Sequence, residues 1–577
     1  MLKNLLRCIG EYKKPSILAP ICVTLEVILE VLIPFLMASL IDEGISSGNM
    51  NRILFYGLIL VAAAMASLAC GALSGHYAAV ASAGFAKNLR QAMFYKVQDF
   101  SFTNIDRFST SSLVTRLTTD VTNVQNAYQM VIRVAVRAPI MLISAFVMAC
   151  KINPRLALIY LAIIPVLGCI LFAIIVTAHP IFSRVFKTYD KLNNVVQENV
   201  HGIRVVKSFV REDYEKEKFN NISGAIFKDF NKAEKLLAFN SPAMQTCVYT
   251  CMLLISWFGA HMIVSNTMTT GELTSMFTYT MQILMSLMML SMIFVMVTMS
   301  RASVERIDEV LKEQPDIKDA AQPVKEVKNG DICFSHVSFS YSKDKNRLSL
   351  KDINLDIKSG ETVGIIGGTG SAKSSLVQLI PRLYDITEGS LTVGGLDVRE
   401  YDLEVLRDAV SMVLQKNVLF SGTIKDNLRW GKKDATDEEM IHACQLAQAD
   451  DFIRTFPDGY DTHIEQGGSN VSGGQKQRLC IARALLKKPK ILILDDSTSA
   501  VDTRTDALIQ KAFAEEIPDT TKLIIAQRIS SVQNADKIVV MDNGRISAVG
   551  THDELLASSH IYQEVYYSQV KGESDDE

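Results

Sequence analysis

The sequence predicts two domains of different class: an α-helical membrane domain with six spans, followed by an α/β domain. Two observations support this prediction. Apolar stretches long enough to cross the hydrocarbon of a bilayer occur throughout the first 300 of the 577 residues. From about residue 329 onward, short β-branched runs such as TVGIIG and ILILDD alternate with helical stretches, which is typical of a largely parallel sheet.

The membrane spans are predicted first. Their approximate bounds are 16–41, 53–83, 129–150, 156–178, 243–264 and 273–298. The connections between the second and third spans and between the fourth and fifth are long and rich in Lys and Arg, whereas the other connections are short. Because positively charged loops stay in the cytoplasm, we expect both termini and both long connections to be cytoplasmic, as helical extensions of the spans.

The N-terminal segment and the domain limits come next. Residues 1–14, MLKNLLRCIGEYKK, lack the features of a signal peptide. They suit an amphipathic helix on the inner membrane surface, with an ordinary tail as the alternative. The ten cysteines are scattered, and the net charge of −3 gives no indication of a nucleic-acid partner. The expected organisation is a membrane domain, a charged linker, an α/β domain and an acidic tail, over 1–310, 311–328, 329–570 and 571–577.

A phosphate-binding loop is predicted where TVGIIG runs into GTGSAKSSLVQLI, a strand, glycine-rich turn and helix. The pattern G-x-x-x-x-G-K-[ST] holds except that Ala372 replaces the second glycine, where a Cβ is expected to strain the loop. Lys373 would reach the β- and γ-phosphates of a nucleotide, and Ser374 with Asp495 would hold Mg²⁺. The predicted loop comprises Gly367, Gly368, Thr369, Gly370, Ser371, Ala372, Lys373, Ser374 and Ser375.

Further motifs follow in a fixed order: VSFSY, MVLQKNVLFSGTIKDN, NVSGGQKQRLCIARALL and SAVD. With the phosphate loop and ILILDD, this set resembles an ATP-binding cassette (ABC) domain. The resemblance implies that Tyr341 stacks on adenine, that Gln415 touches Mg²⁺ and the attacking water, and that Asp502 contacts a second cassette. It also implies a signature loop that clamps the γ-phosphate of a nucleotide on the opposing domain, formed by Ser472, Gly473, Gly474 and Gln475.

The resemblance extends over the membrane half, since six spans with two long cytoplasmic connections, and the stretch NVHGIRVVKSFVRE, are similar to those of ABC exporters. The chain is thus identified as resembling an ABC exporter half-transporter, an α-helical six-span membrane domain fused to an α/β P-loop cassette. This implies ATP and Mg²⁺ as cofactors, a lipid bilayer as environment, a small hydrophobic substrate and a location in the plasma membrane of a bacterium.

Besides Ala372, two residues depart from the family pattern at the ATP site. Asp496 stands where the family has a glutamate that polarises the attacking water, and Gln527 stands where it has a histidine that contacts the γ-phosphate. Aspartate is one methylene too short to reach that water, and glutamine cannot carry positive charge toward the developing negative charge. The sequence therefore predicts a site that binds ATP and hydrolyses it poorly.

The degenerate site predicts a heterodimer, similar to bacterial heterodimeric multidrug-type exporters. The signature loop is intact apart from Val471, so it would complete a competent site on a partner half-transporter that carries the glutamate and histidine. The transported compounds would be hydrophobic compounds, peptides or lipids. The alternative is a homodimer or regulatory subunit in which ATP binding switches conformation with slow hydrolysis.

Charged residues inside the predicted spans are candidates for the membrane pathway. Glu26 and Glu30 share one face of the first span, and Arg133 and Arg137 share one face of the third. Intramembrane charges are costly, so a Glu30–Arg137 pair is expected either as an internal tie or as part of a substrate or proton path. The last span carries methionines along one face, which suit either a cavity for varied apolar ligands or plain packing, at positions 281, 285, 288, 292, 296 and 299.

Overall fold

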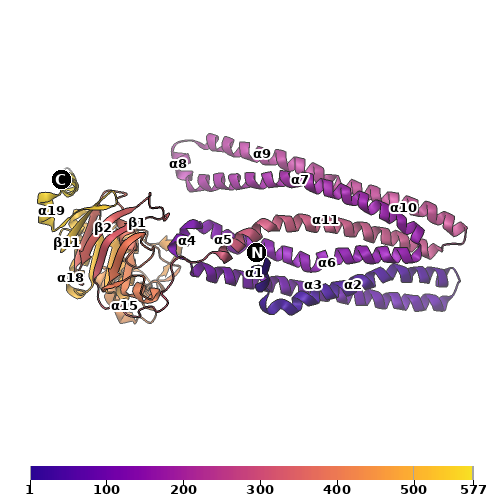
Figure 1. Ribbon diagram of the computed structural model, residues 1–577, viewed down its shortest axis with the longest axis horizontal. Helices are drawn as coiled ribbons and strands as arrows, with labels where there is room; N and C mark the ends of the chain where they lie inside the picture. The colour runs from indigo at the N-terminus through magenta and orange to yellow at the C-terminus, as the bar shows by residue number, and fades with distance from the viewer. Residues whose placement is uncertain (1, 498, 575–577) are drawn as a thin grey trace. The chain divides into compact units, whose positions relative to one another are not determined.

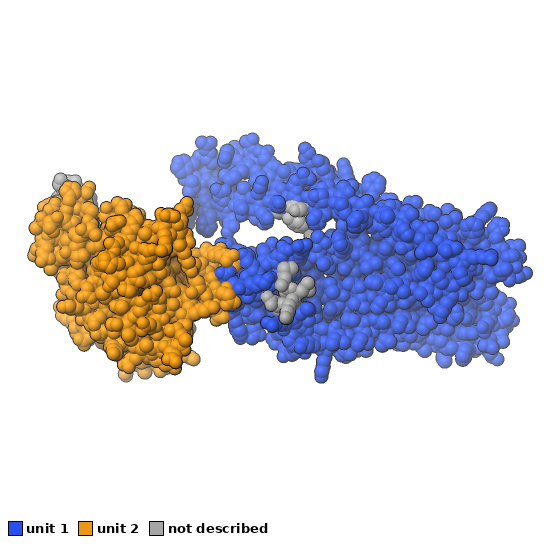
Figure 2. All heavy atoms as spheres, in the orientation of Figure 1, with its two compact units in different colours: residues 1–98, 109–313 blue, residues 99–108, 314–577 orange. Residues whose placement is uncertain are grey.

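The computed structural model describes residues 2–497 and 499–574, and the side chains at 2–4, 183, 186, 299 and 570–574 are outside that description. The methionine predicted at position 299 and the end of the predicted acidic tail, 575–577, therefore lie outside the described residues. The chain forms two compact units, one of residues 1–98 with 109–313 and one of residues 99–108 with 314–577 (Figure 2).

The first unit is helical. Six helical segments among the described residues are long and apolar enough to cross a bilayer, which confirms the predicted fold class. The helices of this unit are α1 Leu2–Arg7, η1 Gly10–Tyr12, α2 Lys13–Ser39, η2 Leu40–Ile45, α3 Met50–Gln98, α5 Thr110–Thr115, η3 Arg116–Asp120, α6 Val121–Ile152, α7 Pro154–His201, α8 Ile203–Ser208, α9 Glu212–Ala238, α10 Asn240–Val264 and α11 Thr270–Lys312.

Several of these helices are far longer than a span requires. Helix α3 has 49 residues, and at about 1.5 Å per residue it is more than twice as long as the hydrocarbon core is thick. Figure 1 shows α2 beside α3, α6 beside α11, and α7 beside α9 along most of their lengths. The long connections of the sequence are thus continuations of the spanning helices.

Small and branched apolar residues bring the helices of the first unit together. Val27 and Val31 of α2 share a buried cluster with Ala145 and Ala149 of α6. Tyr279 of α11 is fully buried, and its hydroxyl donates a hydrogen bond to the carbonyl oxygen of Val31 at 2.8 Å. Such close helix contacts and interhelical hydrogen bonds hold helices together where no hydrophobic driving force acts between them.

The second unit contains two larger sheets, in the orders β2-β1-β4-β5 and β12-β11-β3-β10-β9-β6. The strands are β1 Ile332–Phe339, β2 Leu350–Ile357, β3 Thr362–Gly367, β4 Glu388–Val393, β5 Leu396–Asp397, β6 Val410–Val413, β7 Gly422–Thr423, β8 His463–Ile464, β9 Ile491–Asp495, β10 Thr521–Ile525, β11 Lys537–Asp542 and β12 Arg545–Gly550. The six-stranded sheet is parallel except for its edge strand β12, as the β-branched runs predicted.

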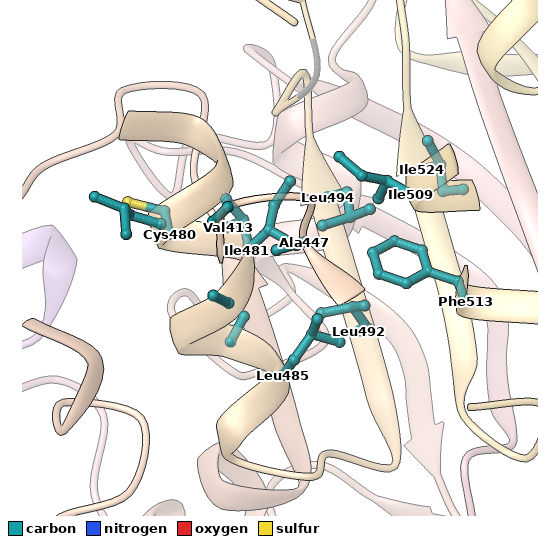
Figure 3. Packing of buried hydrophobic residues seen from close by; sticks show 14 of the residues in the cluster. Val413, Ala447, Cys480, Ile481, Leu485, Leu492, Leu494, Ile509, Phe513 and Ile524 are labelled. Atoms are coloured by element: carbon teal, nitrogen blue, oxygen red, sulfur yellow. The ribbon is translucent and has the colours of Figure 1, made fainter. Parts of the chain in front are cut away.

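The helices of the second unit are α4 Phe102–Arg107, α12 Lys373–Gln378, α13 Leu403–Ala409, α14 Ile424–Leu428, α15 Asp437–Leu446, α16 Asp450–Thr455, η4 Gly459–Asp461, η5 Gln466–Gly468, α17 Gly473–Leu486, α18 Thr503–Glu516, η6 Ile529–Ser531, α19 His552–Ser558 and α20 His560–Ser574. Among them, α12 and α17 contact strands of the parallel sheet. Figure 3 shows Leu492 and Leu494 of β9 packed with Ile481 of α17 and with Phe513 of α18. This packing fixes where β9 ends and where α17 and α18 begin.

Candidate nucleotide-binding site

Three neighbouring parallel strands end at the same edge of the six-stranded sheet. Strand β10 pairs with β3 on one side and with β9 on the other, so that Ile525 lies opposite both Ile365 and Asp495. The carboxyl ends of parallel strands are where α/β proteins bind ligands. This register brings together the predicted phosphate loop after β3, the acidic pair Asp495–Asp496 of β9, and Gln527 after β10.

The loop between β3 and α12 has the backbone of a phosphate-binding turn. Gly367 cannot be replaced, because a Cβ there would lie 2.2 Å from the carbonyl oxygen of Met541. Ala372 is left-handed, with φ +69° and ψ 29°, immediately before α12. An alanine in this region costs about 1–2 kcal/mol relative to right-handed backbone. The strain predicted for Ala372 is therefore located at the residue that precedes α12.

The Lys373 side chain folds back across that loop. Its Nζ donates to the carbonyl oxygens of Gly367 at 2.8 Å and Gly368 at 3.0 Å. Burial lowers the pKa of the Lys373 ammonium below its usual value, and the carboxylates of Asp495 and Asp496 act in the opposite direction. The ammonium group is therefore held in the loop by two carbonyl oxygens, and phosphate oxygens could replace these carbonyls as its hydrogen-bond acceptors.

Ser374 and Asp495, the two residues predicted to hold Mg²⁺, lie beside each other. The Ser374 hydroxyl donates to Asp495 Oδ1 at 2.9 Å. Asp495 is buried, and burial raises the pKa of its carboxyl group while the bond from Ser374 opposes that shift. A hydroxyl and a carboxylate beside a phosphate loop fit Mg²⁺, which is bound through one or two carboxylates together with substrate phosphates.

Asp496 is held by two amides. Its Oδ2 accepts hydrogen bonds from Gln527 Nε2 at 2.7 Å and from Gln415 Nε2 at 3.3 Å. Its backbone is left-handed, with φ +49°, and its N–H donates to the carbonyl oxygen of Ile525 at 3.0 Å. The structure thus brings together three residues that the sequence singled out separately, and the two departures from the family pattern contact each other.

Tyr341, the predicted adenine contact, lies beside α12. Its hydroxyl shares a hydrogen bond with Ser375 Oγ at 2.9 Å, and the side chain remains 44% exposed. The ring packs edge-on against Phe339 and Tyr384, with centroid separations of 4.7 and 5.1 Å. One part of the ring is therefore fixed by protein while the rest is open to a ligand.

Tyr384 is a site residue that sequence reasoning missed. Its hydroxyl donates to Asp106 Oδ2 in α4 at 2.7 Å, and its ring lies 6.0 Å from that of Phe102 in the same helix. Burial, with Asp106 adding to it, raises the pKa of Tyr384 above its usual value. Tyr384 therefore connects the ring of Tyr341 to α4, and nothing in LIPRLYD signals this because its partners lie about 280 residues earlier in the chain.

A second route joins α4 to the loop that carries Tyr341. Ser101, which caps α4, hydrogen-bonds to Asp316 through its hydroxyl. The other oxygen of Asp316 pairs with Lys343 Nζ at 2.9 Å, two residues beyond Tyr341. The part of the site around Tyr341 is thus connected to α4 both through Tyr384 and through Asp316.

The signature loop and Asp502 stand apart from the phosphate loop. Ser472 caps α17 by accepting from the N–H of Gln475 at 3.3 Å, and Asp502 caps α18 by accepting from the N–H of Thr505 at 2.9 Å. That bond lowers the pKa of the exposed Asp502 carboxyl group. Gly474 fits closely, since a Cβ would lie 2.8 Å from the carbonyl oxygen of Ala500. Ser472, Gly473 and Asp502 are exposed.

The charged candidates of the membrane unit divide into two groups. Arg137 pairs with Glu26 through Nη1 and with Glu30 through Nη2, the latter at 2.5 Å. The second oxygen of Glu26 is buried with no hydrogen-bond partner, facing Gly71. Within the described residues, Arg133 forms no ion pair and lies instead near Gly75.

The methionines predicted along one face of α11 differ in their exposure. Met281, Met285 and Met292 are exposed, whereas Met288 packs against the buried cluster of the membrane unit.

A six-helix membrane unit joined to a sheet domain with a phosphate loop, an acidic strand end and a signature loop defines an ATP-driven ABC exporter half-transporter. Family models agree: one described as ABC transporter transmembrane region matches residues 16–287, and one described as ABC transporter matches residues 350–499. The chain belongs to the ABC transporter family. It binds ATP, spans the membrane several times and works as a dimer in a lipid bilayer.

Individual relatives agree with this assignment. The chain is 37% identical over 570 residues to an uncharacterized ABC transporter ATP-binding protein, YfiB, of Bacillus subtilis, covering 98% of this chain and 99% of the relative. It is 32% identical to the ATP-dependent lipid A-core flippase of Desulfotalea psychrophila, over 99% of each chain. A solved bacterial Atm1-family ABC exporter with ATP bound shares the fold, with a TM-score of 0.84 at 24% identity, covering 96% of this chain and 99% of that one.

Proposed function

We propose that this chain is one subunit of an asymmetric heterodimeric exporter. Its own site retains ATP and hydrolyses it slowly, and its signature loop completes a competent site on a different half-transporter. The single observation that carries this proposal is the pairing of Asp496 Oδ2 with the amides of Gln527 and Gln415.

The pairing matters because it holds the Asp496 carboxylate in one orientation, and a general base must place a free lone pair within hydrogen-bond reach of the attacking water. Both amides donate to the same oxygen of Asp496, and the side chain is one methylene shorter than glutamate. Gln527 is neutral, so it does not supply positive charge where negative charge develops on the phosphate. The expected result is a stable ATP-bound state in which binding, rather than hydrolysis, holds two cassettes together.

Nucleotide binding itself would use the loop of residues 367–375. Its backbone N–H groups and the Lys373 ammonium would contact phosphate oxygens, and the exposed part of Tyr341 would stack on adenine. Ser374, Asp495 and Gln415 would hold Mg²⁺, which supplies charge neutralisation between the phosphates. Gln415 would then present its Oε1 in place of the Nε2 that now faces Asp496.

The signature residues would serve the partner. Ser472 and Gly473 are exposed at the start of α17, and Asp502 is exposed at the start of α18. Ser472, Gly473, Gly474 and Gln475 would offer hydroxyl and backbone N–H groups to the γ-phosphate of a nucleotide on another cassette. The Asp502 carboxylate would contact the protein surface of that cassette.

The transported compound is proposed to be hydrophobic: a small apolar compound, a peptide or a lipid. The flippase among the relatives acts on a lipid, and the exposed methionines Met281, Met285 and Met292 offer an adaptable apolar surface. Because Arg137 pairs with both carboxylates, we favour an internal tie over a proton path for Glu26 and Glu30. We propose a bacterial plasma membrane as the location, with both termini cytoplasmic.

The test is ATP turnover in lipid nanodiscs, by this chain alone and by this chain co-expressed with the half-transporter encoded beside it. Near-zero turnover alone and robust turnover in the complex are expected. In the complex, changing the partner's catalytic glutamate should abolish turnover, whereas Asp496→Asn should leave most of it. Robust turnover by the chain alone would overturn the proposal in favour of a homodimer.

A further inference from the structure

We propose that Gln569, in the C-terminal helix α20, is a positioning residue for the nucleotide site. The Gln569 side chain holds the backbone of the segment between β10 and η6, and that segment presents the amide of Gln527 to Asp496. The proposal concerns this chain's own ATP site, so it does not depend on whether the partner is a different half-transporter. None of the motifs that identified the site in the sequence includes Gln569.

The segment that carries Gln527 has no regular secondary structure. Strand β10 ends at Ile525 and η6 begins at Ile529, so residues 526–528 belong to neither element. The side chains of Gln527 and Arg528 are exposed, whereas Ile529 is buried. The backbone N–H and C=O groups here must therefore find partners other than those of a strand ladder or a helical turn.

The side chain of Gln569 supplies two of these partners at once. Its Nε2 donates to the carbonyl oxygen of Gln527 at 2.8 Å, and its Oε1 accepts from the N–H of Ile529 at 2.9 Å. A primary amide carries a donor and an acceptor side by side, so it can bridge a C=O and an N–H two residues apart. The backbone on both sides of Arg528 is thus held by a single side chain.

Helix α20 gives Gln569 a firm support. Tyr562 of this helix is fully buried in the same hydrophobic cluster as Ile529, and its hydroxyl is hydrogen-bonded to His552 Nδ1 at 2.7 Å. Tyr566 packs against the same cluster. Because Gln569 follows Tyr562 by seven residues and Tyr566 by three, all three lie on one face of the helix. The face that packs into the core therefore also carries Gln569, and α20 contacts η6.

The held segment reaches the phosphate site through one further hydrogen bond. Gln527 Nε2 donates to Asp496 Oδ2 at 2.7 Å. Burial lowers the pKa of the Lys373 ammonium in the phosphate loop, and Asp496 is near enough to oppose that shift. If the segment were released, the carboxylate of Asp496 would lose the Gln527 amide and would repel phosphate oxygens more strongly. Bound ATP would then leave this site faster.

The experiment is stopped-flow release of mant-ATP, a fluorescent ATP analogue, from the full-length chain in nanodiscs with Mg²⁺, chased by unlabelled ATP. Gln569→Leu removes both hydrogen bonds and should accelerate release by at least about threefold, as expected for the loss of one or two hydrogen bonds. Gln563→Leu is the matched control, because Gln563 lies on the same helix but donates to the carbonyl oxygen of Leu556 in α19, at 2.7 Å. It should leave the release rate unchanged.

A double-mutant cycle separates positioning from general support of the fold. Because Gln569 acts through Gln527, Gln569→Leu should accelerate release in the otherwise unmodified protein but not in a Gln527→Ala background. Equal acceleration in both backgrounds, or none in the unmodified protein, would overturn the proposal. If Gln569→Leu fails to fold, Gln569→Glu keeps the acceptor for Ile529 but removes the donor to Gln527, and should still accelerate release by about twofold or more.

Discussion

Restoring fast ATP hydrolysis at this chain's own site is expected to require substitutions at both Asp496 and Gln527. Gln527 Nε2 already lies at hydrogen-bond distance, 2.7 Å, from Asp496 Oδ2. A glutamate at position 496 would extend the carboxylate by about 1.5 Å, one carbon–carbon bond, and would press it against that amide. We therefore expect Asp496→Glu alone to raise hydrolysis at this site by less than about tenfold, and Asp496→Glu with Gln527→His to raise it by about 10²-fold or more, the lower range for a positioned general base.

The assay is phosphate release by the heterodimer after the partner's own catalytic glutamate has been changed to glutamine, so that only this chain's site contributes. Asp496→Asn is the matched control, because it keeps the shape of the side chain while removing its basicity. It should change the residual rate less than twofold. A loss of more than tenfold in Asp496→Asn would show that Asp496 already acts as the base, and the reasoning from its two amide bonds would be wrong.

Three further predictions concern stability, each measured by thermal or denaturant unfolding of the full-length protein. Ala372→Gly should change the free energy of unfolding by less than about 1 kcal/mol, because relief of left-handed strain is offset by the freedom of glycine in the unfolded chain; Ala372→Val at the same φ should destabilise by more. Tyr384→Phe and Asp106→Asn should be coupled by about 1–3 kcal/mol in a double-mutant cycle, and additive effects would exclude the hydrogen bond. Arg137→Met should cost about 3–5 kcal/mol by leaving two carboxylates unpaired, and changing both carboxylates to glutamine as well should recover most of it.

The sequence predicted the parts of the structure that depend on local pattern. Apolar stretches of sufficient length identified the six spans, and the order strand, glycine-rich turn, helix located the phosphate loop. The approach of Asp495 to Ser374 also follows from pattern, because Asp495 ends β9, Ser374 follows the loop after β3, and the carboxyl ends of strands in one parallel sheet share one edge.

Contacts between distant segments could not be predicted in the same way. The sequence singled out Asp496 and Gln527 as separate departures, but their hydrogen bond depends on the pairing of β9 with β10. Arg137 pairs with Glu26 as well as with Glu30. Glu26 and Glu30 lie about one helical turn apart, and the apolar pattern of the two helices does not determine which of them faces Arg137. Tyr384 had no signal at all, since an aromatic residue after a helix is ordinarily a packing residue.

The grouping of residues 99–108 with the cassette has a practical consequence for work on fragments. The chain passes between the two units at three places, after residues 98, 108 and 313. A soluble fragment beginning at residue 314 would therefore lack Ser101, Phe102 and Asp106, and would leave the hydroxyl of Tyr384 and one side of its ring without their native contacts. Nucleotide affinities measured on such a fragment would therefore report on a Tyr341 loop that lacks the contacts of α4. A short peptide spanning residues 99–108, added as a separate molecule, should restore those contacts.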